Sequence, residues 1–288
     1  MTEGRTMNTK SDYNTATTDR AHPRVSVSGL CFPTLSAIDA IEAIGELGVS
    51  KTSMTSAKIR ESGVDAVATA SRRHGVSMVT TTALLRFDLT PGADIEGQID
   101  GARADIDQAA AVGAGSVYTL TGRRAFADWD ANAAAYAEAT SDLVQYAADK
   151  GIAVAVEPTN WLYADLNFVH SFHDALLLGV RTGMGVCLDL FHVWTEAELL
   201  DDIRKNIELV SHVQLSNMSA GMRSLPCRDV PGAGDIPIRH IVKELLDSGY
   251  TGTFDLELSG PSIDDRGHRE AATESVAWLG ELLTELGA

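Results

Sequence analysis

Four polar residues in the second half of the chain each lie at or near the end of a short apolar run. Carboxylates and amides are rarely buried without a partner. Three carboxylates that converge in an interior repel one another, and a divalent cation removes that difficulty by supplying positive charge. The pattern therefore predicts a metal site. Its ligands and their runs are Glu157 in IAVAVE (152–157), Asp189 in MGVCLD (184–189), Gln214 in VSHVQLS (210–216) and Glu257 in TFDLELS (253–259).

The ligand atoms of this predicted site are all oxygens, because the three acids offer carboxylates and Gln214 offers its amide carbonyl. Hard oxygen ligands favour Mn²⁺ as the bound ion, with Mg²⁺, Co²⁺ or Zn²⁺ as alternatives. The structural alternative is that one or two of these residues only form hydrogen bonds at the rim of a sheet. Four consecutive strands that end in this way favour the metal site.

His192 and Arg228 are predicted to bind a substrate. His192 lies three residues after Asp189 and could reach a bound ligand, although a histidine with apolar neighbours is as often a structural hydrogen-bonding residue. Arg228 lies in the segment CRDVPGAGDIP, whose glycines and prolines predict a turned loop. An arginine on such a loop suits an anionic or hydroxylated substrate. A surface ion pair with Asp229 or Asp235 is the alternative.

Five further residues are predicted to complete the site. Trp161, Tyr163 and Trp194 follow two of the strands and could form walls of a pocket, with core packing as the alternative. His212 and Asp255 each lie two residues before a predicted ligand, and side chains two apart on a strand share a face. We therefore expect these two to point inward one layer below the ligands and to support them.

These side chains can converge only if the strand ends that carry them meet. From residue 24 onward, short β-branched or apolar runs alternate with longer amphipathic runs, and glycines follow several of the amphipathic runs, as at helix C-termini. The strand candidates are 24–30, 49–54, 76–82, 116–120, 152–157, 184–189, 210–216 and 253–259. The helix candidates are 35–47, 57–74, 95–112, 131–150, 172–181, 196–207, 238–248 and 269–286.

Eight alternating strand–helix pairs predict a single (β/α)₈ TIM barrel, in which functional residues lie at the carboxyl ends of the strands. No GxGxxG follows the first strand and no GxxxxGK[ST] occurs, which argues against a dinucleotide-binding or P-loop sheet. We expect the barrel to cover residues 23–288. Residues 1–22 are rich in Thr, Asn and Asp and lack the apolar stretch of a secretory signal, so we expect a disordered tail there.

The composition limits the partners and the compartment that we expect. Acidic residues outnumber basic ones 40 to 23, and the formal net charge is −17. Nucleic-acid binding needs clustered Lys and Arg, so we expect no nucleic-acid partner. No apolar run is long enough to span a membrane, and we expect no membrane partner. Three scattered cysteines fit neither a disulfide scaffold nor a CxxC zinc site, and we expect a cytoplasmic protein.

Five segments, in a fixed order, resemble the xylose isomerase-like TIM-barrel superfamily, in its sugar phosphate isomerase/epimerase branch. They cover predicted strands five to eight, about residues 150–260, and the N-terminal half carries much weaker similarity. The ordered set is more specific than any of its fragments. The segments are VAVEPTNW, CLDLFHVW, SHVQLSN, RDVPGAGDIP and GYTGTFDLELSG.

The resemblance implies a metal held by Glu157, Asp189, the residue at 214 and Glu257. In ketose 3-epimerases of this family the two glutamates also form the acid–base pair. One removes a proton beside a carbonyl, the other returns it, and the metal stabilises the enediolate. Epimerases of this family usually carry His at 214, where this chain has Gln, as do members similar to hydroxypyruvate isomerase. The missing nitrogen ligand shifts the expected preference further toward hard cations.

The resemblance also implies that His192 and Arg228 bind substrate oxygens. We therefore expect a divalent-metal-dependent isomerase or epimerase that acts on a small polyhydroxylated aldehyde or ketone, and a homo-oligomer is an expectation from the resemblance. The same chemistry with a β-leaving group would make a lyase or dehydratase, for example a 3-keto-glycoside lyase. An endonuclease IV-like role needs several His-bound zinc ions and a basic surface, which this chain's scattered histidines and negative charge disfavour. A sugar-binding barrel without catalysis is the last alternative.

Overall fold

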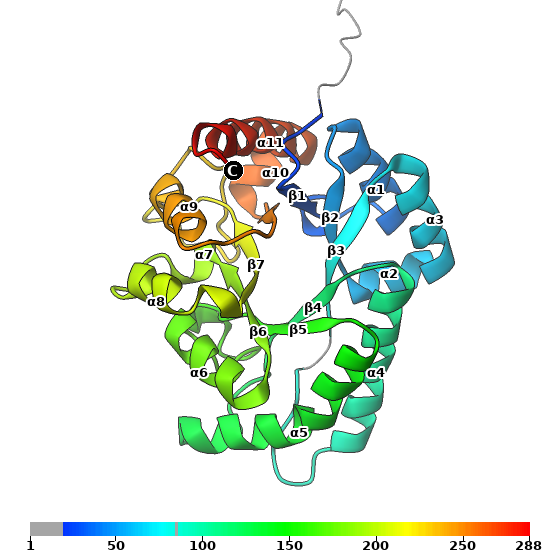
Figure 1. Ribbon diagram of the computed structural model, residues 1–288, viewed down its shortest axis with the longest axis vertical. Helices are drawn as coiled ribbons and strands as arrows, with labels where there is room; N and C mark the ends of the chain where they lie inside the picture. The colour runs from blue at the N-terminus through cyan, green and yellow to red at the C-terminus, as the bar shows by residue number, and fades with distance from the viewer. Residues whose placement is uncertain (1–19, 84–85) are drawn as a thin grey trace, which may run out of the picture.

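Eight parallel strands close into a barrel in the computed structural model, which describes residues 20–83 and 86–288 (Figure 1). Each strand pairs with the next along the chain, and the last pairs with the first, with Val25 opposite Phe254. The predicted TIM barrel is therefore confirmed. The strands are β1 (Val25–Ser28), β2 (Lys51–Thr55), β3 (Ser77–Thr82), β4 (Ser116–Thr119), β5 (Ala153–Val156), β6 (Gly185–Asp189), β7 (Val210–Leu215) and β8 (Phe254–Leu256).

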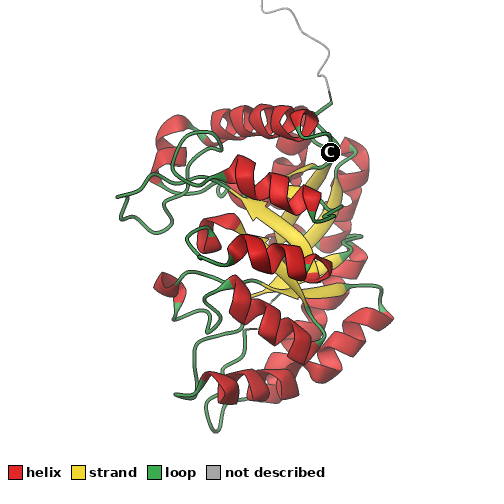
Figure 2. Ribbon diagram, turned by 60° about the vertical axis from the view of Figure 1, so that its left-hand side comes forward, coloured by secondary structure: helices red, strands yellow, loops and turns green. Residues whose placement is uncertain are grey.

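Helices surround the barrel on its outer side (Figure 2). Several begin at a side chain that accepts a hydrogen bond from a free backbone N–H of the first turn, as Ser36 and Ser171 do. The α-helices are α1 (Ala37–Glu46), α2 (Ser56–Ser62), α3 (Val64–His74), α4 (Ile95–Ala111), α5 (Trp129–Asp149), α6 (Phe172–Thr182), α7 (Leu190–Val193), α8 (Leu199–Lys205), α9 (Ile238–Asp247), α10 (Pro261–Arg266) and α11 (His268–Glu285). Three short 3₁₀ helices are η1 (Gly29–Cys31), η2 (Trp161–Tyr163) and η3 (Ile207–Leu209).

Two of the predicted helices differ from those observed. The helix expected over 57–74 is divided into α2 and α3 at Gly63, whose φ of +86° breaks the helical hydrogen-bond pattern. The helix expected over 196–207 shortens to α8, and η3 follows it. The helices α7 and α10 were not predicted, because their four and six residues are too few to show a helical period.

The predicted N-terminal tail falls mostly on residues 1–19, which lie outside the described residues. The predicted boundary at residue 22 is too late, because residues 21 and 22 already contact the barrel. The backbone N–H of Ala21 donates to the carbonyl of Gly48 at 3.1 Å, and Nε2 of His22 lies 3.0 Å from the carbonyl oxygen of Ala288. The described chain therefore begins beside its own C-terminus (Figure 1).

The inside of the barrel is polar where the site lies. Tyr118 on β4 contacts Gln214 on β7, and these strands are not neighbours in the sheet, so the contact crosses the inside of the barrel and both side chains lie within it. Ser26, Ser53 and Asp255 also meet inside, and all of them are buried. Polar groups in such a place need partners, and each of these has one. Among the helices of the described chain, none is long and apolar enough to cross a membrane.

Candidate active site at the carboxyl ends of the strands

The four predicted ligands lie where the sequence placed them, at the carboxyl ends of β5 to β8. Glu157 and Glu257 each follow directly after a strand, and their backbone N–H groups still donate across the sheet, to Thr119 and Leu215. Asp189 ends β6 and is paired in register with Gln214 on β7. All four are buried, so the barrel brings three acids and an amide together in its interior.

Arg228 joins two of these acids through one nitrogen. Its Nη2 lies 2.6 Å from Oδ2 of Asp189 and 2.8 Å from Oε1 of Glu257. Its Nη1 donates to Oγ of Ser216 at 3.1 Å, and the guanidinium lies 4.4 Å from the centre of the Phe191 ring. The side chain is buried, so the surface ion pair with Asp229 or Asp235 is wrong. Arg228 belongs to the site, where its guanidinium binds Asp189 and Glu257. The binding of a substrate by Arg228 stays a prediction.

Hydrogen bonds on both sides of Arg228 hold its loop in place. Backbone groups of Asn217 and Asp229 form an antiparallel bridge, with hydrogen bonds of 2.8 and 2.7 Å. The backbone N–H of Arg228 donates to the carbonyl of Ser259 after β8. The Asn217 side chain also accepts from the N–H of Ile236 and so ties down the far end of the loop. These backbone bonds fix where the guanidinium enters the site.

Gln214 turns its amide nitrogen toward Glu257. Its Nε2 donates to Oε2 of Glu257 at 2.6 Å and to the Tyr118 hydroxyl at 3.3 Å. Its Oε1 accepts from the Cys187 thiol at 3.1 Å, and burial raises the pKa of that thiol well above its ordinary value, so it stays a donor. Ligation of a metal by the Gln214 carbonyl therefore stays a prediction, and it would require this amide to turn over.

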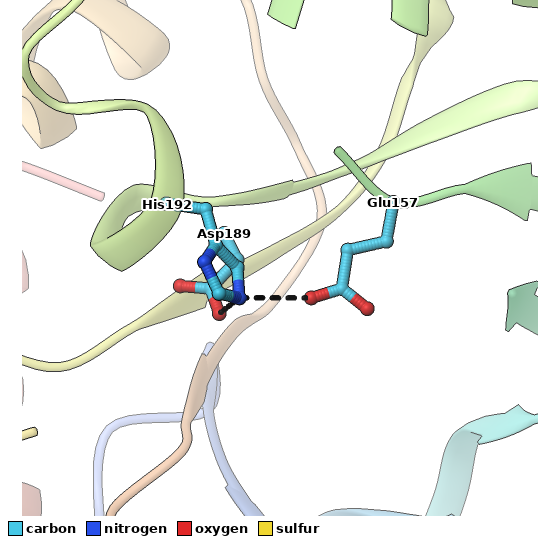
Figure 3. A group of neighbouring side chains, drawn as sticks. All are labelled: Glu157, Asp189 and His192. Atoms are coloured by element: carbon cyan, nitrogen blue, oxygen red, sulfur yellow. Dashed lines mark ion pairs between the residues drawn. The ribbon is translucent and has the colours of Figure 1, made fainter. Parts of the chain in front are cut away.

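His192 points its Nε2 between two acids, 3.8 Å from Oε1 of Glu157 and 3.8 Å from Oδ2 of Asp189 (Figure 3). Its Nδ1 accepts from the backbone N–H of Asn160 at 3.3 Å. Burial lowers the pKa of His192 to about 4, so the ring is neutral and its one proton sits on Nε2. The side chain thus offers a hydrogen-bond donor to the site, which agrees with its predicted substrate-binding role.

The layer below the ligands contains the predicted supporting residues and two serines. Asp255 accepts from Oγ of Ser26 at 2.5 Å and from Oγ of Ser53 at 2.6 Å, and Nε2 of His212 lies 3.4 Å from its Oδ2. The His212 ring stacks on Tyr118, with ring centres 6.1 Å apart. Since Tyr118 also accepts from the amide of the layer above, this network supports the site from below.

Burial controls the ionisation of the three acids. It raises the pKa of Glu157 well above its ordinary value, and the charges of Glu257 and Asp189 raise it further. Burial also raises the pKa of Glu257 to about 7, although Arg228 opposes the rise. Burial acts in the same direction on Asp189, but the adjacent Arg228 leads the effects that hold its pKa below the ordinary value. The site thus combines one permanent carboxylate with two acids that release protons late.

A cavity of about 320 Å³ opens beside these residues. Glu157, Glu257, His192 and Arg228 line one part of it, and the remaining wall is mostly apolar or hydroxyl-bearing. The predicted tryptophan walls are wrong: neither Trp161 nor Trp194 lines the cavity. Trp161 is 73% exposed, and Trp194 packs against the core. The other residues of the wall are Leu30, Thr55, Thr82, Tyr118, Leu120, Thr159, Tyr163, Leu166, Pro226 and Ser259.

The donor set fits a divalent cation in its charge. In their ionised forms Glu157, Asp189 and Glu257 would offer three negative charges against the one positive charge of Arg228, an excess that a divalent ion would balance. Donor atoms of Glu157, Asp189 and His192 lie within 4.8 Å of one another, a group that could hold a metal ion. Because His192 carries its proton on Nε2, the carboxylates are the ligands best suited to the ion.

Sequence reasoning missed several residues that shape the site. Asn160 sets the tautomer of His192, Cys187 orients the amide of Gln214, and Tyr118 links the two layers. Tyr163 was predicted as a wall together with the two tryptophans, and it is the one of the three that lines the cavity. Period-two alternation places Cys187 and Tyr118 on the inner face of their strands, but no residue type in those strands indicates which partner they meet.

The comparisons with known proteins agree with this architecture. The IolI protein with a bound zinc atom shares 14% identity over 91% of this chain and 99% of its own, at a TM-score of 0.78. D-allulose 3-epimerase from Methylomonas sp. shares 15% over 91% and 99%, at 0.75. The probable 3-DHS dehydratase AsbF from Bacillus anthracis shares 14% over 89% and 98%, at 0.73. At such identities these likenesses show the fold alone.

The family model for the xylose isomerase-like TIM barrel matches residues 38–282. The search of curated proteins gave no match. The matched segment contains seven of the eight strands and the site residues Glu157, Asp189, His192, Gln214, Arg228 and Glu257, so the predicted resemblance to this superfamily is confirmed over most of the chain. The geometry and the family model agree: this chain belongs to the xylose isomerase-like TIM barrels.

Proposed function

We propose that this protein is an isomerase or epimerase that removes a proton from the carbon beside a carbonyl group of a small polyhydroxylated substrate. The observation that carries the proposal is that two buried glutamates, Glu157 and Glu257, line one cavity and hold their protons more tightly than ordinary carboxyl groups. A carboxylate with a raised pKa is a stronger base, which the deprotonation of carbon demands.

The two glutamates take opposite roles in this proposal. Glu257, with a pKa of about 7, is ionised in part at neutral pH and acts as the base toward one epimer. Glu157, whose pKa is raised well above its ordinary value, holds its own proton and delivers it to the carbon on the other face. His192 donates its Nε2–H to the substrate oxygen that gains negative charge. In the reverse direction the two glutamates exchange roles.

A divalent cation belongs to this proposal, with Mn²⁺ as the ion that we expect. Asp189 and Glu257 would hold it, with Glu157 as a further ligand in its ionised form, and when bound it would offset negative charge on the substrate oxygens beside the reacting carbon. The zinc atom of the IolI protein and the activity in the name of D-allulose 3-epimerase support a metal-dependent enolisation on this fold. The ion and the substrate named there are those of the two related proteins.

The cavity favours a small uncharged substrate. Its volume of about 320 Å³ is at the lower end of ligand pockets, a size that suits a monosaccharide. Among the described residues that line it, Arg228 is the one cation, and its charge is already engaged by two carboxylates. A phosphate group would therefore find acids without a free positive charge, so we propose that the substrate is not phosphorylated.

A lyase or dehydratase is the second candidate, because AsbF, a probable dehydratase, has the same fold. Both functions begin with the same proton abstraction, and they diverge only if a β-leaving group departs. NMR in D₂O with Mn²⁺, using a panel of ketoses, hydroxypyruvate and 3-keto-glycosides, separates them. Deuterium beside the carbonyl of an isomeric product supports the isomerase, and loss of water or of an aglycone supports the lyase.

The same experiment can contradict both candidates. If no member of the panel exchanges its carbon-bound protons, whether or not it binds, the enolisation proposal is wrong. Binding without exchange would favour a sugar-binding barrel that lacks catalysis. The same panel without enzyme serves as the control for background exchange.

A further inference from the structure

The guanidinium of Arg228 and the proposed divalent ion require the same two oxygen atoms. Oδ2 of Asp189 and Oε1 of Glu257 both accept from Nη2 of Arg228. The remaining oxygens of these acids are also engaged. Oδ1 of Asp189 accepts from the backbone N–H of Phe191 at 3.0 Å, and Oε2 of Glu257 accepts from Gln214. An ion that takes both acids as ligands therefore competes with the donors that these oxygens already have.

Arg228 is the donor that can leave. The N–H of Phe191 belongs to the first turn of α7 and cannot move without that helix. The amide of Gln214 is held from behind by the Cys187 thiol and by Tyr118. Arg228 alone reaches the acids on a long side chain that borders the cavity, and so rotation about its own bonds can withdraw the charge.

We propose that Arg228 occupies the cation position in the ion-free protein and thereby sets the affinity of the site for divalent ions. An ion binds Asp189 and Glu257 only as the guanidinium leaves them and turns toward the cavity. Like charges at this separation repel strongly in a buried site, so the two cations cannot share the position. This inference rests on the proposed function only in taking a divalent ion as the ligand of the site.

The charge balance explains why an internal cation is needed. Three buried carboxylates without a partner would repel one another and destabilise the fold. Arg228 relieves this repulsion between Asp189 and Glu257, and Nε2 of His192 faces the Glu157 carboxyl group at 3.8 Å. Once turned into the cavity, the guanidinium would meet substrate oxygens, so we expect ion and substrate to strengthen each other's binding.

The test is the affinity of the full chain for Mn²⁺ alone, measured from free Mn²⁺ by electron paramagnetic resonance and by calorimetry. Arg228→Met keeps an unbranched apolar stem but removes the guanidinium and its charge, and we expect it to bind Mn²⁺ about tenfold more tightly than the wild type, or better. Arg228→Lys keeps a charge without the planar fork and should fall between the two. Arg204→Met is the matched control, because Arg204 pairs with Glu244 and Asp201 on the exposed surface.

Equal or weaker Mn²⁺ binding by Arg228→Met would overturn the inference, as would an equal gain in Arg204→Met. If Arg228→Met folds only with the ion present, the Mn²⁺-induced rise in Tm of Arg228→Lys, compared with that of the wild type, gives the same answer. The outcome separates from that of the proposed function. If Arg228→Met binds Mn²⁺ more tightly but the wild type exchanges no substrate protons, only the proposed isomerase is contradicted. If the wild type exchanges substrate protons but Arg228→Met has an unchanged Mn²⁺ affinity, only this inference is contradicted.

Discussion

At the scale of single residues, the two glutamates of the site differ in their partners. Glu257 accepts from both Arg228 and Gln214, whereas Nε2 of His192 lies 3.8 Å from the Glu157 carboxylate, too far for a hydrogen bond. Burial raises the pKa of both glutamates, and the charge of Arg228 opposes the rise most directly at Glu257, whose pKa is about 7. The same residue type therefore has two different chemistries in one cavity.

This difference predicts distinct results for Glu157→Gln and Glu257→Gln. Both should lose more than about 10³-fold of net epimer formation, because each removes one of the two proton carriers. In D₂O, however, Glu157→Gln should still exchange the proton of one epimer, and Glu257→Gln that of the other. Circular dichroism and Tm are the controls for folding. Near wild-type turnover in either variant contradicts the two-glutamate mechanism.

At the scale of elements, the loop between β7 and α9 decides where Arg228 lies. Gly234 in this loop has a φ of +131°, a conformation that other residues rarely adopt. A Cβ there would come within 2.5 Å of the carbonyl oxygen of Met218 and 2.6 Å of Oδ1 of Asn217. The loop and the bridge that positions Arg228 thus depend on glycine at this place.

Gly234→Ala should therefore lower the free energy of unfolding by about 3 kcal/mol and disturb the cation position. Gly113→Ala is the matched control. Gly113 also has a positive φ, of +78°, but nothing lies within 4 Å of its Cβ position, so we expect a cost of about 1 kcal/mol. Chemical denaturation measures both. Equal losses of unfolding free energy in the two variants would show that the short distances from a Cβ at residue 234 to Met218 and Asn217 do not destabilise the protein.

At the scale of the whole molecule, the protein carries a net charge of −17, and its candidate site is itself acidic. Such a field repels polyanions and raises the local concentration of cations. One solved structure of this fold, from Brucella melitensis, is named as a family 2 AP endonuclease, at 19% identity. The charge of the present chain points away from nucleic acid.

We predict that the protein neither binds nor cuts duplex DNA that contains an abasic site, even at low salt, where phosphate contacts are strongest. An electrophoretic mobility shift with and without Mn²⁺ or Zn²⁺ tests this. A shifted band that weakens as salt rises would contradict the prediction, and a basic DNA-binding protein under the same conditions is the positive control.

The sequence by itself determined the barrel and the four strand ends. Period-two and helical patterns depend only on which residues must be buried, so the eight strands and most helices could be located without the structure. Parallel strands of a closed barrel bring their carboxyl ends together, and that rule alone placed Glu157, Asp189, Gln214 and Glu257 at one end. Residue 63 was missed as a break because a single glycine within a helical pattern is usually tolerated.

Only the tertiary structure decided which atoms of these residues meet. Arg228 lies on a loop, and its pairing with Asp189 and Glu257 depends on backbone bonds to Asn217 and Ser259 that no local pattern records. The direction of the Gln214 amide depends in the same way on a thiol from the neighbouring strand. Burial patterns specify which side of an element faces the core, whereas hydrogen bonds between distant segments are chosen only once the whole barrel has closed.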